Sequence, residues 1–316
     1  MKSPRVSAVI CTHDPRPDLL DQTLAGLRAQ TLASDEWELL LIDNASASPL
    51  AGRVDLSWHP RARIVREDQL GLTHARLRGF SESQGDIIVC IDDDNDLDAS
   101  YLQEVVKALS ADASLGAIGG KSIARFEREP PDWFQKLGLN LACRDLGDRP
   151  IYAQWADLSV ERQRSYPECA PVGAGMALRR NALRTYADTA ALDSGRTSLG
   201  RKGSNLASGE DNDIIMSILA TGWRVAYLPQ LKLFHAIPAA RLTRDYLARH
   251  SHASNRTWVQ VLNMHGIRPW TPIPPWSVPL RKARAFLALR AWQDDPSYIL
   301  WRGACGLFEG RSQISK

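Results

Sequence analysis

Three adjacent carboxylates, Asp92-Asp93-Asp94, directly follow an apolar run and are the sharpest chemical signal in the sequence. At the end of a strand they would repel one another unless a cation neutralised them. A hard divalent ion such as Mg²⁺ or Mn²⁺ prefers oxygen ligands of this kind. The alternative is a solvated acidic turn, with Asp96 and Asp98 as capping residues before the next helix. The triplet alone leaves both interpretations open.

A second acidic cluster, Ser208 to Asp213, lies where a helix is expected to begin. A carboxylate at this place can take a proton from a substrate hydroxyl if it faces the reaction centre. The same residues also suit an ordinary helix start, because acidic side chains in the first turn meet the positive end of the helix dipole. The cluster therefore allows a general base without requiring one.

Weaker candidates lie elsewhere in the first 240 residues. His235 ends an apolar run and is either a metal ligand or structural. Asp43 follows another apolar run, where it can hold a base or ribose or belong to an Asp-Asn turn. Gly71 opens an expected helix whose backbone amides, together with Arg76, can meet a diphosphate, although a surface helix start explains the pattern equally well.

Alternating strands and helices are expected to position these residues. Between Arg5 and Ile123 this alternation predicts an α/β fold with a mostly parallel sheet covered on both faces. The expected strands are 6–11, 37–42, 63–66, 86–91 and 115–119, and the expected helices are 18–30, 72–83 and 100–109. Polar clusters follow four strands, at 12–14, 43–46, 66–68 and 92–95. They are expected to meet at one edge, because ligands of such sheets bind at the carboxyl ends of the strands.

The remaining chain predicts a second half and a tail. Residues 125–170 read as a long irregular excursion, and 170–180 as a Gly-containing strand or turn. Further expected elements are helices at 181–186, 214–220 and 242–264, a strand at 223–234 ending at His235, and basic aromatic segments at 281–292 and 298–308. These elements divide the chain into a catalytic domain, 1–240, with halves 1–123 and 124–240, and a basic helical extension, 241–316.

The composition is that of an ordinary folded protein: 316 residues, 44% hydrophobic and 24% charged, which argues against a disordered chain or a disulfide-built miniprotein. The net charge of +3 is too small to indicate nucleic-acid binding. The charge is unevenly distributed, because residues 241–316 hold 12 Lys and Arg against 4 Asp and Glu, and residues 1–240 hold 27 against 32. The two parts are therefore expected to have different partners.

The expected location follows from cysteines and apolar segments. Five scattered cysteines without a C-x-x-C pair indicate reduced cytosolic thiols. Met1 to Arg5 leads directly into a strand-like run without a signal-peptide pattern, and no segment reaches the ~18 apolar residues that span a bilayer. The sequence therefore predicts a cytoplasmic protein, soluble or peripheral at the inner face of the cell membrane.

Seven motifs, in order, resemble those of the family 2 glycosyltransferases with the GT-A fold. They are Val9 to Asp14, Leu41 to Ser46, Gly71 to Arg76, Ile91 to Asp94, Gly173 to Met176, Gly209 to Asp211 and the late His235. The resemblance covers residues 5–250 approximately and not the tail after Met264. One departure is His13-Asp14, where many members have Tyr-Asn or Arg-Asn; backbone contacts to the nucleotide would tolerate it.

The resemblance implies a GT-A fold with a nucleotide-binding half, an acceptor half and site roles for individual residues. Thr12 and Asp43 would line the nucleoside pocket, Arg76 would approach the diphosphate, Asp92 the ribose and Asp93 the sugar, with Glu210 in the same donor-binding set. Asp94 and His235 would hold Mn²⁺ or Mg²⁺, and Asp211 would be the catalytic base. The implied reaction is single displacement with inversion, from a nucleoside-diphosphate sugar to a hydroxyl of a saccharide or lipid-linked acceptor.

Several points stay open at this stage. Uridine is the favoured base of the donor, and surface polysaccharide or glycolipid biosynthesis is the pathway by analogy. The alternatives are a catalytically inactive binding subunit and, with less support, a sugar nucleotidyltransferase, since Cys11 to Pro15 lacks the glycine and lysine of a triphosphate loop. The acceptor is expected to contact the segments 125–175 and 193–209. Trp133 and Trp155 in the first segment either stack on sugar rings or pack in the core or a lid.

The basic tail has two interpretations. It can hold the enzyme at an anionic leaflet through Arg281, Lys282, Arg284 and Arg290 beside Phe286, Leu287 and Trp292. It can instead be a helix pair that packs on the catalytic domain with a solvated charged face.

Overall fold

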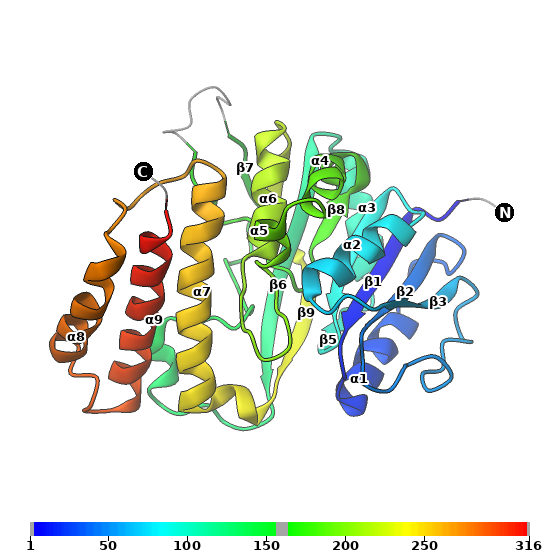
Figure 1. Ribbon diagram of the computed structural model, residues 1–316. Coiled ribbons are helices and arrows are strands. Elements are labelled where there is room, and N and C mark those ends of the chain that lie inside the picture. Colours follow the sequence, from blue (N-terminus) through cyan, green and yellow to red (C-terminus); the bar gives the residue numbers. More distant parts are fainter. Residues whose placement is uncertain (1–2, 156–163, 315–316) are drawn as a thin grey trace.

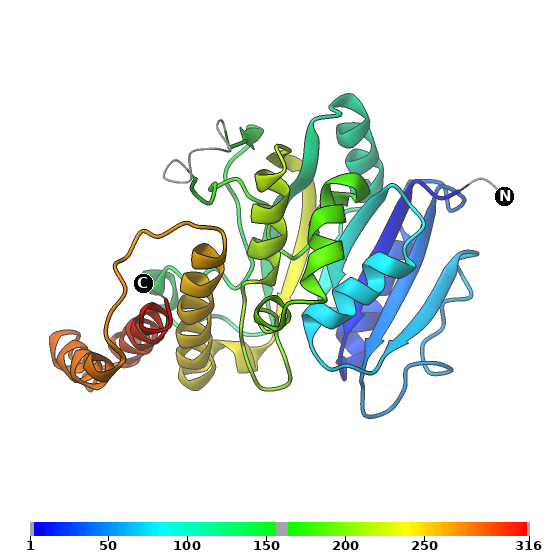
Figure 2. The ribbon, with the colours of Figure 1, turned by 45° about the horizontal axis from the view of Figure 1, so that its top comes forward.

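The computed structural model describes residues 3–155 and 164–314 and shows a central twisted sheet with helices on both faces (Figure 1). The C-terminal helices stand side by side at the end of the molecule far from the N-terminus, as the turned view also shows (Figure 2).

The N-terminal half has the predicted alternation. Its strands are β1 (Val6–Thr12), β2 (Trp37–Asn44), β3 (Ala62–Glu67) and β4 (Ile87–Asp92), and its helices are α1 (Pro17–Arg28), α2 (Leu72–Glu82) and α3 (Tyr101–Ala111). The four strands pair in parallel in the order β3-β2-β1-β4. Every residue of β1 and β2 is buried, as expected of parallel strands covered on both faces.

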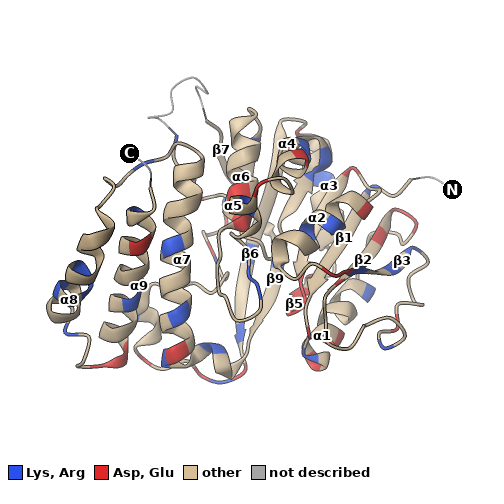
Figure 3. Cartoon of the chain, viewed as in Figure 1, with Lys and Arg blue, Asp and Glu red and all other residues tan. Residues whose placement is uncertain are grey.

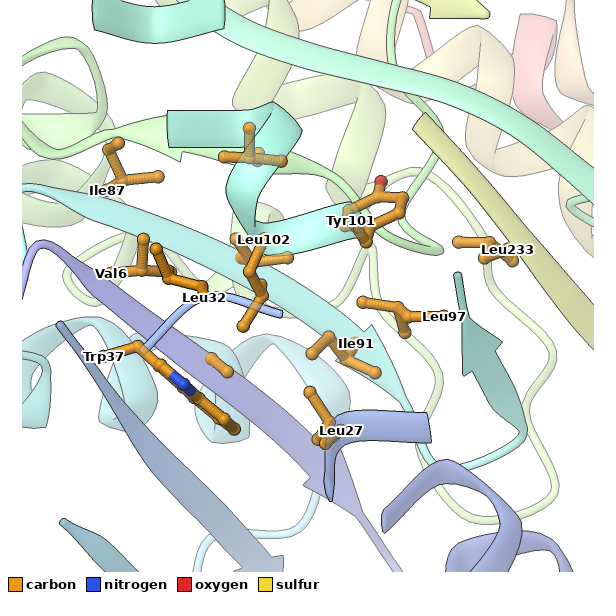
Figure 4. Packing of buried hydrophobic residues seen from close by; sticks show 14 of the residues in the cluster. Val6, Leu27, Leu32, Trp37, Ile87, Ile91, Leu97, Tyr101, Leu102 and Leu233 are labelled. Atoms are coloured by element: carbon orange, nitrogen blue, oxygen red, sulfur yellow. The ribbon is translucent and has the colours of Figure 1, made fainter. Parts of the chain in front are cut away.

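Side chains of successive strand residues pack on opposite layers. Val6, Ala8 and Ile10 of β1 belong to one core cluster with leucines of α1 and α3, part of which is shown in Figure 4. Val9 and Cys11 belong to the other, with Ala75 and Phe80 of α2 and residues of later helices. This period of two fixes the strand register, so the polar residues after each strand emerge at one edge.

The second half of the sheet is mixed. It contains β5 (Asn95–Leu97), β6 (Leu115–Phe126), β7 (Ile151–Ala153), β8 (Ala177–Arg179) and β9 (Arg224–Ile237), with the helices η1 (Phe134–Leu137), α4 (Arg180–Ala190), α5 (Ser194–Thr197) and α6 (Glu210–Ala220). The order continues as β4-β8-β6-β9-β5, and β7 also pairs with β9. β6 and β9 are parallel, whereas β8, β5 and β7 pair antiparallel with their neighbours.

Two predicted boundaries are wrong for the same reason. β9 does not end at His235 but continues to Ile237, and the strand expected at 115–119 continues to Phe126, because these extensions pair with each other. Asp96 is not a helix cap: it lies in β5, and its carboxylate is 3.0 Å from the Arg125 guanidinium. Asp98 does act as a local acceptor, for the Ser100 backbone N–H at 3.0 Å.

The tail comprises η3 (Ala239–Leu242), α7 (Arg244–Met264), η4 (Pro275–Ser277), α8 (Val278–Ala288) and α9 (Asp295–Ser312). α7 begins two residues later than expected because the Thr243 side chain accepts from the Tyr246 N–H and caps the helix. Val261 and Leu262 of α7 join the same core cluster as the α6 residues. A further cluster joins Phe134 and Leu137 to Ile299 and other tail residues, so packing crosses the proposed boundary at residue 241.

α9 packs closely on α7 because it presents glycine to it. A Cβ on Gly306 would lie 2.0 Å from the His252 carbonyl oxygen, and one on Gly310 would lie 2.8 Å from the Val259 Cβ. α8 packs on the far side of α9 and forms the outer edge of the molecule (Figures 1 and 2). The packing of the tail on the catalytic part is therefore made by α7 and α9. Among the helices that the structure describes, none is long and apolar enough to cross a membrane.

Candidate functional site

A cleft with a volume of about 300 Å³ opens at the carboxyl ends of β1 and β4, bounded by the start of α2, the loop before β8, the start of α6 and the end of β9. Its position confirms the edge expected from the polar clusters. Eight of the nine predicted site residues line it: Thr12, Arg76, Asp92, Asp93, Asp94, Glu210, Asp211 and His235. The ninth, Asp43, is not among the lining residues.

The acidic triplet forms a tight turn between β4 and β5 that faces the cleft. The Asp92 N–H donates to the Asn95 side chain at 3.1 Å, and the Thr12 hydroxyl donates to the Asp93 carboxylate. Burial and the neighbouring Asp94 charge raise the pKa of Asp93 to about 7. Asp94 is buried, so the alternative of a fully solvated acidic turn does not describe this segment.

Asp94, His235 and Arg241 form one contact group. The Asp94 carboxylate is 3.2 Å from His235 Nε2 and 2.9 Å from the Arg241 guanidinium, which in turn lies 3.3 Å from His235 Nε2. Burial alone would raise the pKa of Asp94, but His235 and Arg241 lower it to about 2. Burial alone would lower the pKa of His235, but Asp94 raises it to about 10. The two shifts have opposite directions, as expected of two groups that favour each other's charged form.

The donor atoms of Asp94 and His235 fit Mn²⁺ or Mg²⁺ when a phosphate supplies further ligands. Such ions are held by one or two carboxylates together with substrate phosphates, and a neutral imidazole would add a nitrogen ligand. The described residues contain no group of three His, Cys, Asp or Glu arranged to hold an ion by themselves. A metal here would have to bind His235 in its neutral form and take the place of the Arg241 guanidinium beside both ligands.

Asp211 lies in the first turn of α6 and is oriented from two sides. Its Oδ2 accepts from the Gly173 N–H at 3.0 Å, and its Oδ1 accepts from the Asn212 N–H at 2.9 Å. The carboxylate remains partly exposed on the cleft wall. A fixed, partly exposed carboxylate can accept a proton from a hydroxyl that enters the cleft.

Arg76 of α2 lines the cleft and is held there by two carboxylates. It is buried, with its guanidinium 2.7 Å from the Glu210 carboxylate and 3.5 Å from Asp92. A Cβ on Gly173 would lie 2.8 Å from the Arg76 Nη2, which explains the need for glycine at that position. Burial raises the pKa of Glu210 to about 7 against the lowering effect of Arg76. Arg76 and Glu210 therefore join the donor half to the helix that carries Asp211.

Asp43 is used inside the fold. Its carboxylate accepts from the backbone N–H groups of Ser46 and Leu50, at 3.1 and 3.0 Å, and from Arg66 at 2.9 Å. Burial would raise its pKa, but these hydrogen bonds hold the pKa below its ordinary value. Asp43 thus shapes the loop after β2, and its neighbour Asn44 is the residue that lines the cleft.

Sequence reasoning missed two cations of the cleft, Arg201 and Arg241. Arg201 lies in the loop that was expected to meet the acceptor, and Arg241 was assigned to the basic tail. Their positions depend on how β9 and the 193–209 loop return to the sheet, which no local pattern shows. Arg241 follows His235 by six residues and could have been linked to it only by proximity in sequence.

Trp133 and Trp155, the tryptophans of the 125–170 segment, pack against other side chains of the protein. Trp155 is buried, its Nε1 donates to the Ser165 carbonyl at 2.8 Å, and it belongs to the core cluster around α6. Trp133 packs against the cluster that joins the excursion to the tail. The structure therefore shows core packing for both side chains. All five cysteines are free thiols.

Charged residues are distributed as Figure 3 shows, with acidic side chains at the start of α6 and basic ones along the C-terminal helices.

Comparison with solved structures places the fold. A mannosyltransferase from Pyrobaculum calidifontis, solved in complex with GDP-Man and Mn²⁺, superposes with a TM-score of 0.55 at 20% identity, covering 100% of this chain and 77% of the other. Residues 1–349 of Staphylococcus aureus TarS, in complex with UDP-GlcNAc, superpose with a TM-score of 0.52 at 11% identity, covering 95% and 91%. At these identities the likeness shows a shared GT-A fold.

Comparison of sequences gives a curated relative, the glucosyl-dolichyl phosphate glucuronosyltransferase of Haloferax volcanii, which is 21% identical over 253 residues, 78% of this chain and 74% of that protein. The chain spans only 16%, 11% and 38% of the length of three further relatives. A family model described as glycosyl transferase family 2 matches residues 7–186, more than half of the chain. The chain therefore belongs to glycosyl transferase family 2 and is a glycosyltransferase of the GT-A fold.

Proposed function

We propose that this glycosyltransferase is metal-dependent and inverting, and that it moves a sugar from a nucleoside-diphosphate sugar to a hydroxyl of a saccharide or lipid-linked acceptor. The observation that carries the proposal is the placement of Asp211: its carboxylate is held by the Gly173 N–H in the same cleft as the Asp94 and His235 pair. The cleft thus holds both a base and groups suited to a charged donor.

The acceptor hydroxyl would lose its proton to Asp211 as its oxygen attacks the anomeric carbon from the side opposite the leaving diphosphate. That geometry inverts the anomeric centre. Because the Gly173 N–H and the Asn212 N–H fix the carboxylate, little reorganisation is needed at the moment of transfer.

The donor would lie along the carboxyl ends of β1 and β4. Thr12 orients Asp93, and Asp92 with Asp93 would face the ribose and sugar. Arg201 and Arg241, together with Arg76, supply positive charge to the cleft where the diphosphate would sit. A bound Mn²⁺ or Mg²⁺, held by Asp94 and His235, would supply charge that stabilises the leaving diphosphate.

The identities of base and acceptor remain proposals. Uridine is our proposed base, although the structural neighbours include both a GDP-Man and a UDP-GlcNAc complex. The glucosyl-dolichyl phosphate in the name of the Haloferax relative favours a lipid-linked acceptor, and surface polysaccharide or glycolipid biosynthesis is the proposed setting.

Thermal unfolding with a panel of nucleoside diphosphates and nucleotide sugars, each with Mn²⁺, Mg²⁺ or EDTA, tests the donor site. A ligand at 100 times its Kd stabilises the native state by about 2.7 kcal/mol. We expect such a shift with one base and only with metal present, and we expect Asp94→Ala to abolish it. A shift that persists unchanged in EDTA and in Asp94→Ala would remove the metal from the proposal. No shift with any nucleotide would favour an inactive binding subunit.

A further inference from the structure

Large apolar side chains are exposed on α8 and on the residues that flank it. On α8, Leu280 is 67% and Leu287 65% exposed. Trp276 of η4 is 75% exposed, and Trp292, which follows α8 and packs against Phe286, is 61% exposed. Trp276, Leu280 and Leu287 are separated by four and seven residues, so they lie on one side of the continuous turn formed by η4 and α8. Exposed apolar stripes of this kind mark interaction surfaces.

The opposite face of α8 accounts for its packing on α9. Lys282 lies 2.5 Å from the Glu309 carboxylate, the Trp301 Nε1 donates to the Lys282 carbonyl at 3.0 Å, and Phe286 packs edge-on against Trp301. The apolar stripe is therefore additional to what α8 needs to hold its place in the fold. Figures 1 and 2 show that α8 has α9 on one side and no element on the other.

Positive charge borders the stripe. Arg281, Arg284 and Arg290 are exposed and make no ion pair with any residue in the described part of the chain. The sequence from Tyr246 to Gln293 contains no Asp or Glu (Figure 3). A second copy docking through the same face would bring these arginines together without an acidic partner, so the charge pattern disfavours self-association.

We propose that the outer face of α8, formed by Trp276, Leu280, Leu287 and Trp292 with Arg281, Arg284 and Arg290, docks on the surface of an anionic lipid bilayer. An amphipathic helix with basic and apolar residues lies in the interface, where leucines enter the acyl boundary and tryptophans sit at the headgroups. The arginines are attracted to anionic headgroups.

Docking would also fix the cleft relative to the bilayer. α8 is joined through α9 to α7, and α7 begins three residues after Arg241, which lines the cleft. That this orientation brings a lipid-linked acceptor to the cleft rests on the proposed function, whereas docking of α8 on the bilayer does not depend on that function.

Sedimentation of the full chain with vesicles tests the proposal. One vesicle set is phosphatidylcholine alone, and the other is equal parts of phosphatidylcholine and phosphatidylglycerol. We expect binding to the second set only, weakened by salt. The variant Arg281→Gln/Arg284→Gln/Arg290→Gln should lower the partition coefficient by on the order of a hundredfold. Leu280→Ser/Leu287→Ser should lower it by at least about tenfold.

Matched controls come from elsewhere on the surface. Leu192→Ser removes another leucine, 88% exposed, and Arg78→Gln/Arg149→Gln/Arg184→Gln removes the same charge; both should bind vesicles as the parent does. Absence of salt-sensitive binding to anionic vesicles would overturn the proposal, as would equal losses in the control variants. A dimer that the leucine variant dissociates would assign the face to a second copy instead. Thermal shifts with nucleotide should be the same in all four variants, so failure of the donor site is measured separately.

Discussion

Charges in the cleft and charges on the outer face of α8 are arranged in opposite ways. In the cleft, buried Arg76 is paired with buried Glu210, and Arg241 is paired with the buried Asp94. On α8, exposed Arg284 has no acidic partner among the described residues. Breaking a buried pair leaves an uncompensated charge inside the protein, whereas an exposed charge mainly affects association. The two regions should therefore respond to charge removal in different measurements.

Replacing Asp211 with Asn should give the largest effect on the cleft. Loss of a general base typically costs 10²- to 10⁴-fold in rate, or about 3 to 5 kcal/mol of barrier. Steady-state kinetics should show a fall in kcat of this size, while titration with the donor shows unchanged affinity, because the amide oxygen can still accept from the Gly173 N–H.

The matched control is Asp188→Asn, which removes an exposed carboxylate on α4 that is 3.8 Å from Arg184. It should leave kcat unchanged. If Asp211→Asn instead lost donor binding together with turnover, the carboxylate would belong to the donor site and not to the base.

Arg76→Met should give the largest effect on stability. The substitution keeps an elongated side chain but leaves Glu210 buried without its partner, which costs about 3 to 5 kcal/mol. Urea denaturation measures this change. Adding Glu210→Gln should recover part of the loss, and no recovery would show that packing, not charge, is responsible. The exposed pair offers a comparison, since Arg184→Met should change stability by about 0.5 kcal/mol or less.

His250 on α7 should make the protein sensitive to acid. Burial and the charges of Arg201 and Arg241 lower its pKa from 6.5 to about 4. The unfolded chain therefore binds a proton at this histidine at higher pH than the folded chain does. Neutral His250 contributes about 3 kcal/mol to the free energy of unfolding above pH 6.5, and this contribution is lost as the pH falls towards 4. Urea denaturation at a series of pH values measures the unfolding free energy. This free energy should depend less on pH in His250→Gln than in the parent, and an equal pH dependence in both proteins would contradict the assignment.

Arg284→Gln should give the smallest effect on the folded protein. We expect a change within about 0.5 kcal/mol in unfolding free energy and no change in donor affinity. Vesicle binding should nevertheless weaken by about fivefold, because each arginine near an anionic surface contributes about 1 kcal/mol. If Arg284→Gln lowered the unfolding free energy as much as Arg76→Met does, the proposed difference between paired charges in the cleft and unpaired charges on α8 would be wrong.

Local pattern was sufficient for the donor half of the molecule. Each strand from β1 to β4 contains an apolar run and is followed by polar residues, and parallel pairing places those polar residues at one edge whatever the details of packing. The convergence of Thr12 and Asp92 could therefore be predicted from the strand pattern, whereas the place of Asp211 beside them was implied only by the family resemblance. Expected helix boundaries differed by one to four residues, as at α2 and α4.

Contacts between distant segments could not be predicted in this way. Nothing in the sequence around Arg76 indicates that α6 places Glu210 against it, across 134 residues of chain. The carboxylate of Asp43 also accepts from Arg66, 23 residues further along the chain, and β5 is a strand because it pairs with residues 233–235 of β9. In each case the role of the residue depends on which side chains the tertiary fold brings next to it. The residue type alone is compatible with every one of these roles.

The antiparallel strand β8 has a consequence for how the protein folds. Leu178 of β8 pairs with Ile88 of β4 on one side and with Ala117 of β6 on the other. The sheet is therefore continuous only after the long chain segment before β8 has closed. Pairings so distant in sequence form slowly, because loop-closure entropy is lost before they contribute. The β3-β2-β1-β4 layer can assemble during synthesis from contiguous chain. The Gly173 N–H that orients Asp211 arrives with β8, so the enzyme should acquire its donor-binding edge early and its catalytic geometry late.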